Sequence, residues 1–140
     1  MAASAKFGIA GVLAIMAMVG TALPASATDV GGDGNPAVDC PNGYTVASRT
    51  IERNGQVIGT VEMRWSWACS GNWTRTTSYI GARQLRSGIN TQPFDRHTYG
   101  DDYAVQNWSP YRRVAPTQSM CSYGQIIDEN GYGWGMHFCV

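Results

Sequence analysis

An Asn-Gly dipeptide at positions 54 and 55 is followed by a stretch in which apolar and polar side chains alternate. Over residues 57–69 the odd positions are mostly apolar, and the even positions from 60 to 66 carry Thr, Glu, Arg and Ser. Alternation with a period of two is typical of a strand with one buried face. Asn-Gly is the preferred centre of a two-residue hairpin turn. Together with residues 44–52 before the turn, this pattern predicts a long β-hairpin.

The turn also determines which residues face each other across this hairpin, provided that no bulge shifts the count. The predicted pairs are Tyr44 with Trp65, Val46 with Met63, Ser48 with Val61, and Cys40 with Cys69. The two cysteines form a non-hydrogen-bonded pair, in which Cα atoms approach to about 4.5 Å. A disulfide tolerates this separation. The sequence therefore predicts a Cys40–Cys69 disulfide.

A second hairpin is predicted close to the last residue, where positions 129–131 read Glu-Asn-Gly. A three-residue loop with Gly131 in the left-handed conformation places Cys121 opposite Cys139. The sequence contains four cysteines, and an even number in a short exported domain is typical of a disulfide framework. We therefore predict Cys121–Cys139 as the second disulfide. Because the cysteines have no CxxC spacing, a zinc site is not expected.

The rest of the sequence also favours sheet over helix. Charged residues make up only 14% of the chain, which contains 17 glycines and five tryptophans. Residues 73–80, 103–108 and 111–114 are further strand candidates. The predicted fold is all-β, a small antiparallel barrel or sandwich of about six or seven strands stapled by the two disulfides. Residues 81–100 show no clear periodicity and are predicted as a long loop, a kind of segment that often carries function.

Three segments are expected along the chain. Residues 1–27 are typical of a cleavable secretion signal, with one Lys, an apolar stretch and a final Ala-Ser-Ala cleavage pattern. The alternative is an uncleaved membrane anchor, for which the apolar stretch is at the short limit. Residues 28–38, which are rich in Gly and Asp, are predicted as a flexible N-terminal arm. Residues 39–140 then form the disulfide-bonded β-domain, and the mature protein is expected to be extracellular.

Several motifs resemble a known family. Residues 59–66 read Gly-Thr-Val-Glu-Met-Arg-Trp-Ser, and Asn-Trp-Thr-Arg follows at residues 72–75. Over roughly residues 40–125 the chain resembles a family of small secreted actinobacterial proteins that is catalogued as a domain of unknown function. The family pattern is G-x-V-E-x-R-Y-S, a cysteine, and N-W-A-R, so that Trp and Thr stand here in place of Tyr and Ala. The resemblance implies export and a disulfide-bonded β-domain, without a catalytic residue or a substrate.

The charge balance argues against a nucleic-acid partner. Nine arginines and ten carboxylates follow residue 27, which leaves one negative charge and no basic surface. The sequence has no HExxH motif and no GxSxG elbow, and disulfide bonding removes all four cysteines as nucleophiles. The pairs Asp29/Asp33 and Asp101/Asp102 do not match a calcium loop. We therefore expect no metal, no cofactor and no enzyme activity.

Aromatic and arginine residues are the candidate binding residues. Trp65 and Trp67 lie on the apolar face of their predicted strand and are expected in the core. Glu62 and Arg64 point to the other face, where a solvated charge ladder is the simplest interpretation. The candidate binding residues are Trp108, Tyr111, Arg112 and Arg113, together with Arg83, Arg86 and Arg96 in the predicted loop.

These features favour a secreted, non-enzymatic interaction module that binds another exported protein, for example as an adaptor in a multi-protein or toxin assembly. One alternative is a module that binds carbohydrate or cell wall through exposed aromatic residues. A second is a small nuclease-type toxin that uses Glu62, Arg64, His97 and His137 for proton transfer and phosphate binding. A third is a protease inhibitor that presents residues 81–100. No membrane partner is expected after signal cleavage.

Overall fold

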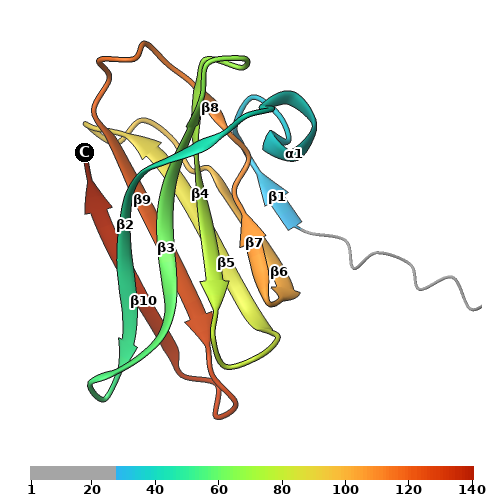
Figure 1. Cartoon of the computed structure of the whole chain (residues 1–140), viewed down its shortest axis with the longest axis vertical. Helices are drawn as coiled ribbons and strands as arrows, with labels where there is room; N and C mark the ends of the chain where they lie inside the picture. Colours follow the sequence, from blue (N-terminus) through green and yellow to red (C-terminus); the bar gives the residue numbers. More distant parts are fainter. Residues whose placement is uncertain (1–27) are drawn as a thin grey trace, which may run out of the picture.

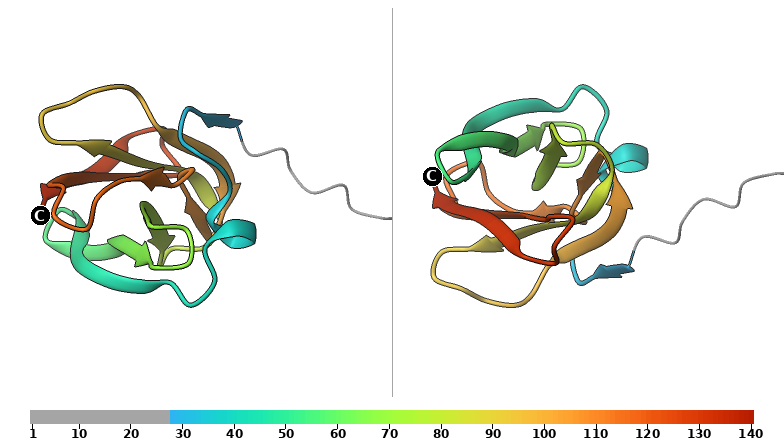
Figure 2. Two further views of the ribbon diagram at one scale, coloured as in Figure 1. Left: turned by 90° about the horizontal axis from the view of Figure 1, so that it is seen from above. Right: turned by 90° about the horizontal axis from the view of Figure 1, so that it is seen from below.

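Two antiparallel sheets pack face to face in a β-sandwich (Figures 1 and 2). The computed structural model describes residues 28–140, so the predicted secretion signal, residues 1–27, lies outside the described residues. Sheet I contains, in spatial order, β1 (Thr28–Val30), β6 (Tyr99–Ala104), β5 (Arg83–Thr91), β9 (Met120–Ile127) and β10 (Gly133–Cys139). Sheet II contains β2 (Tyr44–Arg53), β3 (Gln56–Ser66), β4 (Gly71–Ser78) and β7 (Gln106–Trp108), and β8 (Arg112–Arg113) pairs with β4. The prediction of an all-β fold with two disulfides is confirmed, and the sheets form a sandwich rather than a closed barrel.

The first hairpin is present, and two bulges interrupt it. Its ends keep the predicted register, with Tyr44 opposite Trp65. Between the ends, Ile58 is an extra residue on β3 and Val46 is an extra residue on β2. The two bulges cancel, so the Cys40–Cys69 disulfide forms with a Cα–Cα distance of 5.0 Å. The predicted pairs Val46–Met63 and Ser48–Val61 are wrong: the observed pairs are Ala47–Met63 and Ser48–Glu62.

The second hairpin follows its predicted register throughout. Gly131 has a φ of 82°, which a residue with a side chain rarely adopts, and this closes the three-residue loop. The pairs run without a bulge from Gly133–Ile127 to Cys139–Cys121. The Cys121–Cys139 disulfide is therefore also confirmed, with a Cα–Cα distance of 4.0 Å.

The prediction of a long loop over residues 81–100 is wrong. β5 occupies residues 83–91 of this segment and lies in the middle of sheet I, between β6 and β9. Its inward residues are Leu85, Ser87 and Ile89, all of which are fully buried. The polar Ser87 interrupts the apolar alternation that would have indicated a strand. Only residues 92–98 remain as a loop between β5 and β6.

The segment predicted as a flexible arm, residues 28–38, is instead packed against the sandwich. β1 pairs with β6, and the backbone N–H of Asp33 donates to the carbonyl of Tyr111. The short helix α1 (Pro36–Asp39) follows, and the side chain of Asn35 caps its first turn. No helix among residues 28–140 is long and apolar enough to cross a membrane.

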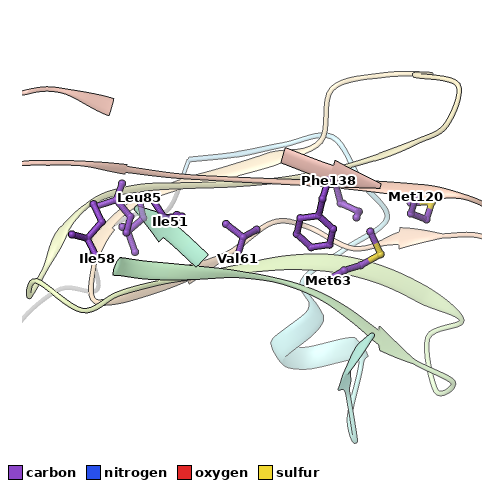
Figure 3. Close-up of a cluster of buried hydrophobic side chains, with 9 residues drawn as sticks. Ile51, Ile58, Val61, Met63, Leu85, Met120 and Phe138 are labelled. Atoms are coloured by element: carbon purple, nitrogen blue, oxygen red, sulfur yellow. The ribbon is translucent and has the colours of Figure 1, made fainter. Parts of the chain in front are cut away.

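The space between the sheets is divided into an apolar and a polar part. The apolar part is formed by fully or nearly fully buried side chains of both sheets, seven of which are labelled in Figure 3: Ile51, Ile58, Val61, Met63, Leu85, Met120 and Phe138. The polar part lies where β4 and β7 cover β5. There Ser87 donates to Asn107 Oδ1 over 2.6 Å, and Thr74 donates to the hydroxyl of Ser122 over 2.8 Å. Hydrogen bonds between side chains thus join the two sheets.

A second, small core lies on the outer face of sheet II. The Cys40–Cys69 disulfide packs there with Trp73 and Tyr111, which are 6% and 2% exposed. The prediction of a buried Trp65 is confirmed, but Trp67 is 64% exposed and its assignment to the core is wrong. β3 ends at Ser66 and the chain then turns, so the strand alternation does not extend to Trp67.

Candidate binding surfaces

The four residues proposed for a nuclease-type site do not come together. Glu62 and Arg64 alternate with the buried Val61 and Met63 on β3, so they lie on the outer face of sheet II. His137 alternates with the buried Phe138 on β10, which places it on the outer face of sheet I. The whole sandwich therefore separates the carboxylate and the arginine from this histidine. The arrangement rules out a shared active site for the four residues.

The two histidines, however, meet in one groove on the outer face of sheet I. This groove has a volume of about 610 Å³, and its lining includes Arg86, His97, Tyr99, Tyr123 and His137. Its floor is Gly88, which faces Tyr99 on β6 and Tyr123 on β9. Tyr123 in turn faces His137 on β10, so one row of residues crosses four strands. The glycine adds no side chain of its own between the two tyrosines.

The loop of residues 92–98 forms one wall of the groove. The rings of Phe94 and His97 are in edge-to-face contact, with centroids 5.2 Å apart. His97 is also edge-to-face with Tyr99, with centroids 6.5 Å apart. These contacts continue an aromatic surface from the loop to β6. Phe94 is 60% exposed, so this surface is open to solvent.

Arg86 and Asp101 form a bidentate ion pair beside the groove. Arg86 Nε and Nη2 each donate to a carboxylate oxygen of Asp101 over 2.6 Å. The guanidinium carbon also lies 4.8 Å from the centroid of the Tyr99 ring. The hydrogen bonds to Asp101 raise the pKa of Arg86, and burial raises the pKa of Tyr123. The pair is therefore fixed and has no net charge.

The predicted cluster around Trp108 is split by the fold. Trp108 is 39% exposed, and its indole N–H donates to Asn35 over 3.3 Å. Tyr111 and Arg112 are only 2% and 4% exposed. Tyr111 belongs to the small outer core, and Arg112 donates a hydrogen bond to Asp95. These two residues therefore stabilise the fold, and Trp108 lies at an open surface.

The remaining candidate arginines lie in separate places. Arg113 donates to the carbonyl of Cys69 over 3.3 Å, beside the small outer core. Arg83 is 3.5 Å from the carboxylate of Glu129 in the second hairpin loop. Arg96 is in the loop after β5, 3.8 Å from Asp95. Of the seven candidate binding residues, only Arg86 lines the groove that contains the histidines.

A charge network covers the outer face of sheet II. Glu62 accepts hydrogen bonds from Arg75 Nε over 2.6 Å and from Arg75 Nη2 over 2.9 Å. Thr45 donates to the same carboxylate over 2.7 Å, and Arg64 lies 3.7 Å from it. Arg64 also donates to the carbonyl of Gly43 over 2.6 Å. The predicted charge ladder is thus an ordered network in which each charged group has a partner.

This network makes the stability depend on pH. Burial raises the pKa of Glu62, but the hydrogen bonds from Arg75 and Thr45 and the charges of Arg75 and Arg64 outweigh it, so that the pKa is lowered from 4.5. A carboxyl with a lowered pKa stabilises the fold above its unfolded pKa and loses this effect as the pH falls through its folded pKa. We expect Glu62→Gln to lower the free energy of unfolding by about 1 kcal/mol at pH 7.

Urea unfolding at several pH values checks this expectation. The difference between parent and Glu62→Gln should be full at pH 7 and shrink as the pH falls below 4.5. Glu52→Gln is the matched control, because Glu52 is an exposed carboxylate on the neighbouring strand outside the network. A difference for Glu62→Gln that stayed constant down to acid pH would contradict the role of the charge.

Exposed apolar side chains gather at one end of the sandwich. A hollow of about 300 Å³ is lined there by Tyr44, Val46, Trp65, Trp67 and Val140. Four of these five side chains are between 43% and 64% exposed, and Trp65 is buried. Within residues 28–140, the indole N–H of Trp65 has no hydrogen-bond acceptor. An apolar hollow of this kind is typical of a surface that contacts another molecule.

The two edge strands beside this hollow, β2 and β10, differ in how well they are protected from pairing with a strand of another molecule. β2 carries a bulge at Val46, and Arg49 points inward, 5.1 Å from the ring of Phe138. Bulges and inward-pointing charges are features that prevent an edge from pairing with another strand. β10 has neither: its seven residues, from Gly133 to Cys139, contain no charged Asp, Glu, Lys or Arg, and their register is regular. β10 is thus the less protected of these two edges.

Three potential metal ligands lie close together at the end of β10. They are Cys121, His137 and Cys139, whose ligand atoms lie within 4.8 Å of one another. Both sulfurs are joined in a disulfide, so neither is a thiolate that can bind a metal. This cluster is therefore a disulfide with a neighbouring imidazole.

The motif that suggested a family forms most of β3. Its Glu and Arg are Glu62 and Arg64 of the charge network. Membership of the family of small secreted actinobacterial proteins stays a prediction. No family model, no curated protein and no solved structure matches the chain.

Proposed function

We propose that this protein is a secreted, non-enzymatic binding module that holds an extended segment of a partner protein against β10. The observation that carries the proposal is the regular, uncharged free edge of β10. A strand added to such an edge gains affinity from backbone hydrogen bonds and specificity from alternate side chains. The proposal retains the interaction module expected from the sequence and assigns the partner contact to this edge.

The free hydrogen-bonding groups of β10 follow from its pairing with β9. Met120 and Val140 exchange two backbone hydrogen bonds, over 3.0 and 2.9 Å. Hydrogen-bonded and non-hydrogen-bonded pairs alternate along an antiparallel ladder. The N–H and C=O groups of Gly135, His137 and Cys139 therefore point away from β9, toward the free edge. They offer an incoming strand three residues to pair with.

The side chains beside this edge indicate the chemistry of the partner. Trp134 and Met136 point toward the apolar core but are only partly buried, because no strand within residues 28–140 follows β10 in sheet I. A partner with an apolar side chain at every second position would cover them. Val140, the next residue after β10, lines the apolar hollow, so the partner segment has room there for one more apolar side chain.

The two disulfides support the assignment of this function to an extracytoplasmic compartment, because disulfides persist in oxidising environments. The partner would then be another exported protein. The protease-inhibitor alternative keeps only residues 92–98 as a loop to present, since β5 occupies residues 83–91 and β6 begins at Tyr99. The nuclease-type alternative loses its shared active site, as described above.

The test is hydrogen exchange of the backbone amides of β10 with and without partner. The protein is used to capture binding proteins from the native culture supernatant, and the purified complex is compared with the free protein by NMR. We expect the amides of Gly135, His137 and Cys139 to exchange fast in the free protein and slowly in the complex. The amides of Trp134, Met136 and Phe138, which bond to β9, should be slow in both.

Two lysine variants provide the matched comparison. Met136→Lys places an inward charge on the β10 edge and should weaken capture at least tenfold. Val57→Lys changes an exposed valine near the first turn and should leave capture unchanged. A complex in which the three outward amides stay unprotected, or one that Met136→Lys leaves intact, would overturn the proposal. If these three amides were protected in a dimer of this chain without any other protein, the β10 edge would bind a second copy of the chain. That result would overturn the proposal of a different partner protein.

A further inference from the structure

The groove on the outer face of sheet I is a second surface, on a face of the sheet rather than at its edge. Neither the free edge of β10 nor the packing of the core requires its aromatic walls. We propose that this groove binds a pyranose ring of an uncharged glycan chain, held between Tyr99 and Tyr123 above Gly88. This inference is independent of the protein partner at β10.

The spacing of the strands suits a single sugar ring. Tyr99 and Tyr123 lie on either side of Gly88, one strand away from it in each direction. Neighbouring strands are about 4.8 Å apart, so the two tyrosine Cα atoms are separated by about 9.6 Å. Side chains that start at this separation leave room for one sugar ring between them, beside the Arg86 guanidinium that lies against the Tyr99 ring. Both tyrosines are partly exposed, so their rings are accessible.

The backbone conformation at the floor of the groove does not require a glycine. Gly88 does not have a φ in the left-handed region. A Cβ added there would lie 3.7 and 3.8 Å from the Cβ atoms of Tyr99 and Tyr123, at ordinary contact distance, and 3.3 Å from the carbonyl of Thr98. A small side chain is therefore accommodated with a slight shift of Thr98. What a larger side chain would remove is the space between the tyrosines.

The polar groups of the groove are suited to hydrogen-bond the hydroxyl groups of an uncharged ligand rather than to bind an ion. The bidentate pair of Arg86 and Asp101 is neutral as a unit, and it uses only two of the five guanidinium N–H donors. The remaining donors and carboxylate lone pairs are oriented by the pair itself. His97 and His137 add ring nitrogens that donate or accept. Aromatic walls with a few fixed polar groups are typical of small-molecule binding sites.

The histidines provide a direct probe of this site. The chain contains only two histidines, and both line the groove. Proton NMR of the protein in heavy water therefore shows two imidazole Hε1 signals, both from the groove. We expect one of the probes cellohexaose, chitohexaose or maltohexaose to shift both signals in a saturable manner at millimolar concentration.

Three variants test whether the shift reports on the groove. Gly88→Val, which fills the floor, and Tyr123→Ala, which removes one wall, should each weaken binding at least tenfold. Tyr132→Ala, which removes a 68% exposed tyrosine outside the groove, should leave binding unchanged. Near-ultraviolet circular dichroism identifies any variant that does not fold, in which case the other groove variant decides. Two unmoved imidazole signals with all three hexasaccharides, or binding that both folded groove variants retain, would overturn the proposal.

Discussion

Replacing Cys40 and Cys69 together by alanine is expected to lower the free energy of unfolding by about 4 kcal/mol. The disulfide closes a loop between residues 29 positions apart, and constraining the unfolded chain in this way stabilises a protein by about 3.5 kcal/mol. The two sulfurs are also buried against Trp73 and Tyr111, so the double variant loses packing in the small outer core. Many domains of this size have a total stability of about 5–15 kcal/mol. The variant is therefore expected to lose a large share of its total stability.

The second disulfide provides the matched comparison. Cys121 and Cys139 are 18 positions apart, and Cys139 is exposed, so their double alanine variant should lose about 3 kcal/mol. Urea unfolding at neutral pH measures both differences.

Burial also predicts the order in which the two disulfides are reduced: dithiothreitol should open Cys121–Cys139 in the native protein while Cys40–Cys69 stays closed. Mass spectrometry of alkylated samples follows this order, and early opening of Cys40–Cys69 would contradict the buried position of that disulfide.

Both disulfides could be predicted because the signals that place them are local. Asn54-Gly55 and the Glu-Asn-Gly loop each determine the register of the strands that flank them, and the cysteines lie on those strands or within four residues of their ends. No turn-forming sequence marks the two bulges in the first hairpin, so they could not be predicted. They cancel, which is why the ends of the hairpin remain in register and the centre does not.

β5 and the groove were not predicted because each depends on contacts between distant segments. Ser87 is buried only because Asn107 and Thr76 satisfy its hydroxyl, and these partners are 20 and 11 positions away. A buried polar residue of this kind removes the apolar alternation from which a strand is recognised. The groove combines residues from β5, β6, β9 and β10, with only Arg86 and the two histidines singled out by sequence reasoning. Their neighbours Tyr99 and Tyr123 become relevant only through the strand order of sheet I.

The polar part of the interior is expected to be as important for stability as the apolar part. Asn107 is 4% exposed and connects β7 of sheet II to sheet I through its side chain. Its amide donates to the carbonyls of Leu85 and Gly100 over 3.2 and 3.0 Å, and its Oδ1 accepts from Ser87 over 2.6 Å. Asn107→Ala would remove these three side-chain hydrogen bonds in a site from which water is excluded, while Ser87 would keep the hydroxyl of Thr76 as a partner. A hydrogen bond of this kind contributes about 0.5–1.5 kcal/mol net, so the loss of three of them is expected to cost about 3 kcal/mol.

Gln106→Ala is the matched control, since the neighbouring amide is exposed and bonds only to the hydroxyl of Thr77. It should change the free energy of unfolding by less than about 0.5 kcal/mol. Urea unfolding of the two variants compares a buried with an exposed side-chain amide on one short strand. If Asn107→Ala were as stable as Gln106→Ala, the hydrogen bonds of the Asn107 side chain would contribute nothing net to stability. The packing of the apolar cluster would then account for most of the attraction between the two sheets, and β7 would be held mainly through its backbone pairing to β4.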